Sequence, residues 1–367
     1  MTTTEHAPVP ESDVLHRLSL LDRFLPAWIG AAMVLGLLLG AAIPQLDDWL
    51  DNVKIGTVSL PIAVGLLLMM YPVLAKVRYR RLDEAIDRRS LTFSLVLNWV
   101  VGPALMFALA WLFLSDLPEY RTGLIIVGLA RCIAMVLIWN DLACGDRELA
   151  AVLVAINSLF QIAAFSVLGW FYLEVLPRWL GLGTQVLDVS MWVIAKVVLV
   201  FLGIPLVAGF LTRLIGERTK GVEWYEQRFL PRIGPVALYG LLFTIVVLFA
   251  LQGDKITSEP WDVVRIALPL LAYFAIMWFG AFFAGMRLGF PYERNASIAF
   301  TAAGNNFELA IAVAIGVFGV TSGEALAGVV GPLIEVPVLV GLVYVALWAR
   351  RRFYASSAPK PAATTGS

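Results

Sequence analysis

Long apolar segments separated by short polar connections run through the chain from residue 25 to residue 349. A helix that crosses a lipid bilayer needs about 20 consecutive, mostly apolar residues. Segments of this kind are 25–43, 57–76, 91–114, 121–141, 149–175, 190–212, 233–251, 263–286, 295–319 and 325–349. The pattern therefore predicts an all-α polytopic membrane protein with ten transmembrane helices, and no connection is long enough to form a soluble domain.

The Lys and Arg residues favour one orientation of these helices. If the N-terminus is cytoplasmic, the cytoplasmic segments hold 20 of the 27 basic residues and the opposite segments hold four. Cytoplasmic connections of membrane proteins are enriched in Lys and Arg. We therefore expect both termini in the cytoplasm, with 1–23 and 351–367 as retained tails and the basic connection 213–232 as a loop that fixes the orientation.

Ten helices divide into two sets of five, and an odd number in each set makes the second insert upside down relative to the first. We therefore predict inverted five-helix repeats over residues 24–176 and 188–350. A Pro–Gly pattern around Gly65 has a weak echo around Gly240. Transporters with inverted repeats bind their substrate near the midplane, where a discontinuous helix of each repeat lies. The two most polar membrane segments, the fourth and the ninth, occupy corresponding places in the repeats.

Composition narrows the class of protein. Apolar residues make up 60% of the chain, charged residues make up 15%, the mean hydropathy is +0.83 and the formal net charge is zero. These values exclude ordinary cytosolic enzymes, disordered chains and basic nucleic-acid binders. Both histidines, His6 and His16, lie in the N-terminal tail. A catalytic triad or a histidine-ligated metal site inside the membrane therefore has no histidine to use, and we expect no enzymatic activity, cofactor or bound metal.

Glu308 is an ionisable residue inside an apolar segment, and such residues are costly in a membrane unless they serve a function. Gly304, Asn305 and Asn306 come just before it and favour an interruption of the helix. A carboxylate at this depth can exchange a proton with water on alternate sides, as a proton-coupled carrier requires. The alternative is a structural ion pair with Arg131.

Cys132 follows Arg131 in the other polar segment. A thiolate is a soft ligand for thiophilic centres, and the neighbouring guanidinium favours the thiolate form. The alternative is a small buried side chain that only packs against its neighbours. Cys144 lies roughly 18 Å further along a continuous helix, so we predict that it does not share a ligand site with Cys132.

Other polar residues complete the predicted site. Glu335, between Pro332 and Pro337, is a second candidate for proton coupling. Trp139 is predicted to share a helical face with Cys132. Amide side chains that we expect to form interhelical hydrogen bonds are Asn98, Asn157 and Gln161.

Several long motifs resemble one family. They include Gly128-Leu-Ala-Arg131-Cys132-Ile-Ala-Met-Val and Gly304-Asn305-Asn306-Phe307-Glu308-Leu-Ala-Ile-Ala, together with residues 69–79, 98–113 and 139–143. These motifs resemble the arsenite efflux permeases of the arsenical-resistance-three type, in the bile acid/arsenite/riboflavin transporter superfamily. The resemblance extends over about residues 20–350. It implies that helices 4 and 9 are discontinuous and cross, and that the protein exports arsenite from the cytoplasm by proton antiport across the cell membrane.

The same resemblance assigns the family's essential cysteine to Cys132 and its essential glutamate to Glu308. Around them we expect Asn305, Asn306 and Trp139 to contact substrate and Glu335 to share the proton coupling. Arg131 and Asn98 are expected to support the site. The expected partners are arsenite, in some members antimonite, protons and the lipid bilayer, with no nucleic acid and no obligatory protein partner. Cys144 departs from the family pattern.

Three other functions remain open at this point. The nearest is a sodium-coupled organic anion symporter on the same superfamily fold. An intramembrane enzyme would need a nucleophile and base inside the bundle, and Asp141 lies at a segment end. A sensor or scaffold would need an output domain, which the short connections do not provide.

Overall fold

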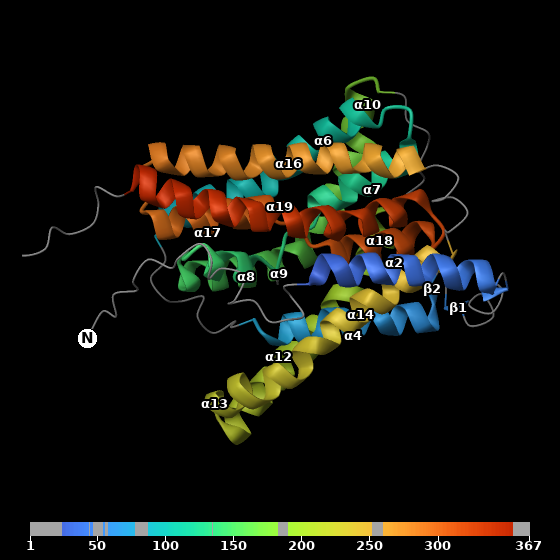
Figure 1. Cartoon of the computed structure of the whole chain (residues 1–367), viewed down its shortest axis with the longest axis horizontal. Helices are drawn as coiled ribbons and strands as arrows, with labels where there is room; N and C mark the ends of the chain where they lie inside the picture. Colours follow the sequence, from blue (N-terminus) through green and yellow to red (C-terminus); the bar gives the residue numbers. More distant parts are fainter. Residues whose placement is uncertain are drawn as a thin grey trace, which may run out of the picture.

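The computed structural model describes residues 24–43, 45–46, 54–55, 58–77, 87–133, 135–182, 190–251 and 260–354. Nearly all the regular structure in these residues is helical, as predicted, apart from a short antiparallel hairpin of β1 (Lys54–Ile55) and β2 (Val58–Ser59). Long helices such as α16 (Pro260–Arg287) and α19 (Gly323–Phe353) lie side by side along the bundle (Figure 1). The predicted tail 1–23 lies outside the described residues. Of the predicted tail 351–367, the first three residues continue α19, and 355–367 lie outside the described residues.

Several helical stretches are long and apolar enough to cross a bilayer. In the described part of the chain these are Arg88–Phe113, Arg147–Trp179, Met191–Lys220, Val222–Leu251, Pro260–Arg287 and Gly323–Phe353. Shorter apolar helices are α2 (Leu25–Ala42), α4 (Leu60–Ala75) and α18 (Phe307–Phe318). The chain is therefore a multi-pass membrane protein.

Four of these stretches contain a π-helical turn two residues before a proline. Proline lacks the N–H of a regular turn, and its ring clashes with the carbonyl group four residues earlier. A wider π turn accommodates this defect without ending the helix. The combinations are α5 (Arg88–Val96), η4 (Leu97–Val101) and α6 (Gly102–Phe113); α9 (Arg147–Trp170), η5 (Phe171–Val175) and α10 (Leu176–Trp179); α11 (Met191–Val198), η6 (Leu199–Gly203) and α12 (Ile204–Lys220); and α13 (Val222–Trp224), η7 (Tyr225–Phe229) and α14 (Leu230–Leu251).

Two predicted segments are interrupted in the middle. Residues 121–141 form α7 (Pro118–Leu129) and α8 (Met135–Leu142), and residues 295–319 form α17 (Tyr292–Ala303) and α18. The predicted interruption at Gly304, Asn305 and Asn306 is thus confirmed. We call residues 130–133 and 304–306 the paired breaks, because their extended backbones lie against each other.

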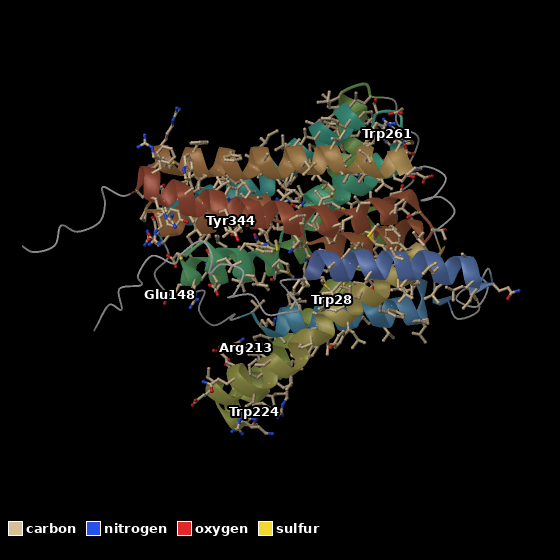
Figure 2. The ribbon with its side chains drawn as sticks, in the orientation of Figure 1. Trp28, Glu148, Arg213, Trp224, Trp261 and Tyr344 are labelled. Carbon is tan, nitrogen blue, oxygen red and sulfur yellow. The ribbon has the colours of Figure 1, made fainter. Side chains whose placement is uncertain are left out.

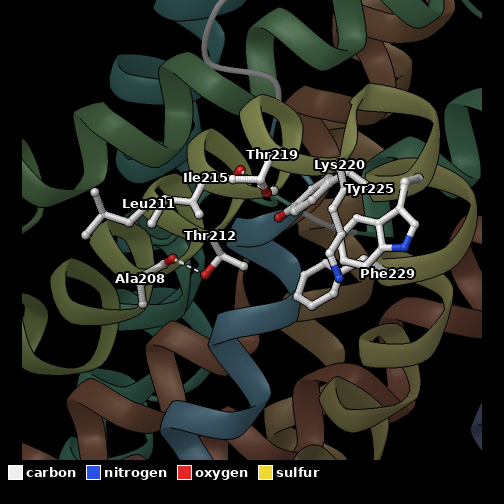
Figure 3. Close-up of a pocket in the computed structure, with 10 residues that line it drawn as sticks. Ala208, Leu211, Thr212, Ile215, Thr219, Lys220, Tyr225 and Phe229 are labelled. Carbon is white, nitrogen blue, oxygen red and sulfur yellow. Dashed lines mark hydrogen bonds between the residues drawn. The ribbon is translucent and has the colours of Figure 1, made fainter.

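The basic connection 213–232 is not a loop. Helix α12 continues to Lys220, and α13 begins two residues later at Val222. The hairpin of α12 and α13 projects from the bundle and carries Arg213 and Trp224 (Figures 1 and 2). A pocket lies between α12 and η7 of this hairpin (Figure 3).

Three helices are joined at their N-terminal ends by charged groups. The Asp87 carboxylate caps α5, and a hydrogen bond from the Ser90 hydroxyl holds the pKa of Asp87 below its usual range. Asp146 caps α9 through two backbone N–H groups at 3.0 Å. Arg294 of α17 lies between the two caps, 3.6 Å from Asp87 and 3.9 Å from Asp146.

Helix α14 packs closely against α4 through glycine. A Cβ atom added at Gly240 would lie 2.9 Å from the Gly65 carbonyl oxygen and 3.0 Å from the Met69 backbone. Small residues allow membrane helices to approach in this way. The two glycines of the sequence echo therefore meet in space.

We expect Gly240→Val to force these helices apart and to lower the free energy of unfolding by about 1–3 kcal/mol. Thermal unfolding in detergent measures the effect. Gly341→Val is the matched control, because no heavy atom lies within 4 Å of a Cβ atom added at Gly341. Equal unfolding temperatures for the two variants would contradict this account of the packing.

Candidate functional site

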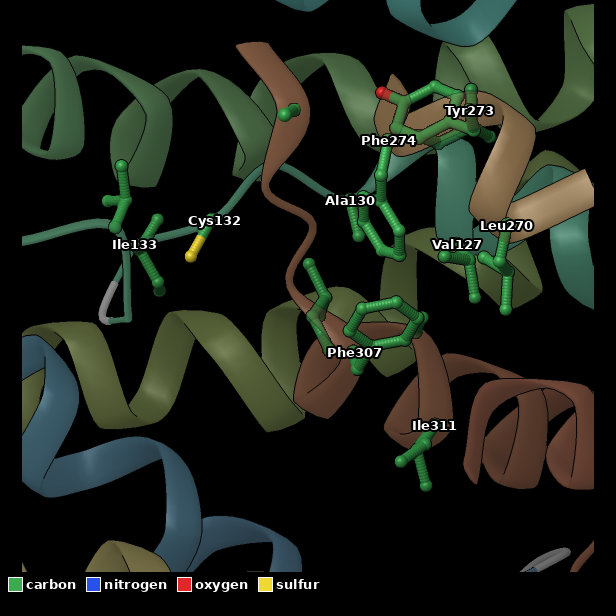
Figure 4. Close-up of a cluster of buried hydrophobic side chains, with 14 of the residues drawn as sticks. Val127, Ala130, Cys132, Ile133, Leu270, Tyr273, Phe274, Phe307 and Ile311 are labelled. Carbon is green, nitrogen blue, oxygen red and sulfur yellow. The ribbon is translucent and has the colours of Figure 1, made fainter. Parts of the chain in front are cut away.

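The paired breaks form a short antiparallel bridge deep in the bundle. Arg131 pairs with Asn305, the Cys132 N–H donates to the Gly304 carbonyl at 3.3 Å, and the Asn306 N–H donates to the Ala130 carbonyl at 3.1 Å. Figure 4 shows the two extended segments with Ala130, Cys132 and Phe307 around them. Each break supplies the hydrogen bonds that the other lacks, which is required of non-helical backbone inside a membrane.

At the breaks, side chains form hydrogen bonds with the backbone groups that are left unpaired at the helix ends. The Asn305 amide donates to the Val127 carbonyl at 2.9 Å, and the Arg131 guanidinium donates to the Gly128 carbonyl, so both bind the C-terminal end of α7. The Asn306 side chain accepts from the Leu309 N–H at 3.1 Å and caps α18. The negative end of one half-helix dipole is thus bound by a cation and an amide.

Arg131 is completely buried and is held from several sides. Its guanidinium donates to the Tyr273 hydroxyl at 2.7 Å, and its backbone N–H donates to Gln161 at 3.0 Å. Gly102 provides the room, since a Cβ atom there would lie 2.7 Å from the guanidinium. No ion pair of Arg131 is present among the described residues, so the structure does not contain the alternative pair with Glu308.

The two predicted carboxylates have different surroundings. Glu335 is 3% exposed and accepts a hydrogen bond from the Asn305 N–H at 3.1 Å. Glu308 lies in the first turn of α18, is partly accessible, and accepts no hydrogen bond from another described residue. One carboxylate therefore supports the breaks, while the other is available to a proton or a ligand.

Cys132 lies in the extended part of its break and is 3% exposed. It forms no disulfide. A Cβ atom at Gly304 would lie 3.0 Å from the Cβ atom of Cys132 and 3.6 Å from its sulfur. The glycine thus lets the thiol lie directly against the second break.

The predicted helical face shared by Cys132 and Trp139 is wrong. Residues 130–133 are not helical, and Trp139 lies in α8 beyond the break. Trp139 is 1% exposed, and its indole N–H has no partner in the described part of the chain. The extended backbone is favoured because it pairs with residues 304–306, which are far away in the sequence.

Comparison with known proteins now identifies the family. The model of the sodium bile acid symporter family matches residues 63–259. An arsenical-resistance protein Acr3 of Corynebacterium glutamicum is 63% identical over 333 residues, which is 90% of each chain. The chain belongs to the sodium bile acid symporter family.

Two further relatives align with similar shares of this chain. An Acr3 arsenical-resistance protein of Alkaliphilus metalliredigens is 32% identical over 90% of this chain and 94% of its own. An uncharacterized transporter of Synechocystis is 36% identical over 89% of this chain and 88% of its own. Within the symporter family the chain thus groups with the Acr3 type, and it is a membrane transporter rather than an enzyme.

The predicted amide network of this family member is present in part. Asn157 accepts from the Trp99 indole at 3.2 Å, and Gln161 accepts from the Arg131 backbone, so these two amides join different elements as predicted. Asn98 donates to Ser94 of its own helical stretch at 3.3 Å, so its predicted interhelical bond is wrong. The side-chain oxygen of Asn98 has no hydrogen-bond partner among the described residues.

Sequence reasoning missed Tyr273 and Gly102, which position Arg131. Neither carries a signal in an apolar helix, because tyrosine and glycine are ordinary there. It also missed Asn140 of α8, which accepts from the Ser297 hydroxyl of α17 at 2.6 Å and joins the two half-helices beyond the breaks. Cys144 lies in the turn after α8 with a φ of 55°.

Proposed function

We propose that this protein exports arsenite from the cytoplasm in exchange for protons, and that it accepts antimonite in the same site. The observation that carries the proposal is the thiol of Cys132 in one break beside Gly304 of the other, in a chain 63% identical to an Acr3 arsenical-resistance protein. The site lies where the half-helices meet, as in other transporters with discontinuous helices.

The chemistry of the site suits arsenite. Near neutral pH arsenite is an uncharged trihydroxide with a thiophilic centre, so it needs a soft ligand and hydrogen-bonding groups rather than a large anion site. Cys132 supplies one sulfur, and one sulfur suits reversible binding. Among the described residues, the Asn305 oxygen and the Asn306 nitrogen in the breaks have no partner and are available to hydroxyl groups. The Trp139 indole N–H also has no partner in the described part of the chain and is a further donor.

Glu308 is the proposed proton carrier, and Glu335 is proposed to share the proton coupling. Protonation of Glu308 from the outside would accompany arsenite release. The proposed frame is ten transmembrane helices in two inverted repeats, 24–176 and 188–350, with both termini cytoplasmic. Support comes from the contact between Gly65 and Gly240 and from one broken helix in each repeat.

Sodium-coupled uptake of an organic anion is the second candidate, because the family model carries that name. Coupling sodium ions commonly bind free carbonyl groups at half-helix C-termini. At the end of α7 the guanidinium of Arg131 and the amide of Asn305 already bind those carbonyl groups. This arrangement supports proton coupling over sodium coupling.

Purified protein in proteoliposomes tests the proposal. We expect an imposed pH gradient to drive arsenite transport, with antimonite competing and sodium having no effect. Transport that needs a sodium gradient and ignores pH would overturn it.

Replacing the thiol tests the substrate. Cys132→Ala should weaken arsenite transport by about tenfold or more, equivalent to about 1.4 kcal/mol. Cys144→Ala is the matched control and should transport like wild type. Equal activity of the two variants would remove Cys132 from the substrate site.

A further inference from the structure

The projecting hairpin contains a pocket far from the paired breaks. It has a volume of about 460 Å³ and lies between α12 and the start of the following helix (Figure 3). The part of the lining that comes from the middle of α12 is apolar, with Leu211 and Ile215, and Lys220 lies at the end of the same helix. Lys220 lies beside Trp224, on whose ring Phe229 stacks at 5.8 Å. The pocket is therefore amphipathic along its length.

Along the pocket, the exposed side chains of α12 change from apolar to basic. Its exposed side chains are apolar up to Ile215, which is 57% exposed. Arg218 and Lys220 follow and are exposed as well. Apolar side chains that face outward in a membrane helix contact acyl chains, while Lys, Arg and Trp concentrate at the headgroup level. The pocket thus spans the boundary between acyl chains and headgroups.

The charges around the pocket favour an anion. Residues 208–232 contain five basic and three acidic residues. Two of the carboxylates, Glu217 and Glu226, are bound by Arg213 at 2.7 and 2.8 Å. Lys220 forms no ion pair among the described residues, and its ammonium group lies 4.5 Å from the centre of the Trp224 ring. The aromatic ring holds a positive charge at the rim of the pocket.

We infer that this pocket binds one anionic glycerophospholipid. An acyl chain lies along Leu211 and Ile215, and the phosphate group lies at Lys220, beside Trp224. Nothing in this site depends on arsenite or on proton coupling, so the inference stands apart from the proposed function.

The lipid would act on the bundle through α4. At the floor of the pocket, Thr212 accepts a hydrogen bond from Tyr71 of α4 at 3.1 Å. The Tyr225 hydroxyl donates to the Ala75 carbonyl at 3.1 Å, and Arg213 donates to the Lys76 carbonyl at 3.0 Å. Filling the pocket stabilises the hairpin on the end of α4.

Native mass spectrometry and thermal unfolding of the delipidated full chain test the inference. We expect phosphatidylglycerol to bind as a single adduct and to raise the unfolding temperature, phosphatidylcholine to do so less, and inorganic phosphate to have no effect. Stabilisation by inorganic phosphate alone would indicate a free-anion site. Equal effects of the two lipids would indicate that binding does not depend on the headgroup charge. Either result overturns the inference.

Variants locate the binding site. Lys220→Gln should weaken phosphatidylglycerol binding by about fivefold. Lys196→Gln is the matched control, because Lys196 lies 5.4 Å from the Trp192 ring centre but outside the pocket. Ile215→Trp should fill the apolar end and reduce binding of both lipids. Equal losses in the two lysine variants, or full binding by Ile215→Trp, would show that lipid binds elsewhere.

Discussion

Proton-driven arsenite transport is expected to fall by about 100-fold or more when Glu308 is replaced by glutamine, in line with the contribution of a positioned proton-transfer group. Glutamine has nearly the same shape but cannot take up and release a proton. Glu308 accepts no hydrogen bond from another described residue, so the variant should keep its unfolding temperature. Uptake into proteoliposomes under an imposed pH gradient measures the loss.

Two further glutamates serve as comparisons. Glu148→Gln alters an exposed side chain near the start of α9 and should transport like wild type. Glu335→Gln keeps an oxygen that can accept from the Asn305 N–H, so we expect a smaller loss than for Glu308→Gln. Unchanged pH-driven transport by Glu308→Gln would remove this residue from the coupling mechanism.

Gly102→Val is expected to displace the Arg131 guanidinium and to abolish transport. The guanidinium lies 2.7 Å and the Tyr273 hydroxyl 3.0 Å from a Cβ atom added at Gly102. The extra methyl groups would break the bonds of Arg131 to Tyr273 and to the Gly128 carbonyl, and overpacking alone costs about 1–3 kcal/mol. Transport in proteoliposomes and thermal unfolding in detergent measure the two effects.

A matched glycine separates this effect from a general loss of flexibility. Gly280 also lies in a membrane helix, but no heavy atom lies within 4 Å of a Cβ atom added there. Gly280→Val should therefore keep both stability and transport. If Gly102→Val transports as well as Gly280→Val, the position of Arg131 is not required.

The helical segments could be predicted from sequence because each depends on a local run of apolar residues. The break at Gly304, Asn305 and Asn306 was also visible, since these residues disfavour helix. The break at residues 130–133 has no such composition. It forms because the second break supplies hydrogen-bond partners more than 170 residues away, as in the bond from Asn305 to the Val127 carbonyl, where the sequence separation is 178 residues.

The residues that surround the site could not be predicted from local sequence patterns for the same reason. Arg131 was recognised as a buried cation, but its partner Tyr273 is 142 residues away. The π turns also change which residues share a helical face. A turn with an additional residue shifts the 3.6-residue period that sequence analysis assumes. Asn98 lies in such a turn and bonds to its own helical stretch.

The guanidinium of Arg131 has one more consequence, which concerns the membrane potential. Moving one elementary charge through 100 mV changes the free energy by about 2.3 kcal/mol. Arg131 forms no ion pair among the described residues, so it leaves a positive charge at the paired breaks. If Glu308 of α18 carries the proton as proposed, the net charge of the site changes with the protonation of Glu308. Any step that moves the paired breaks through the electric field is then driven or opposed by voltage. Transport of an uncharged substrate would therefore respond to membrane voltage even at equal pH on both sides.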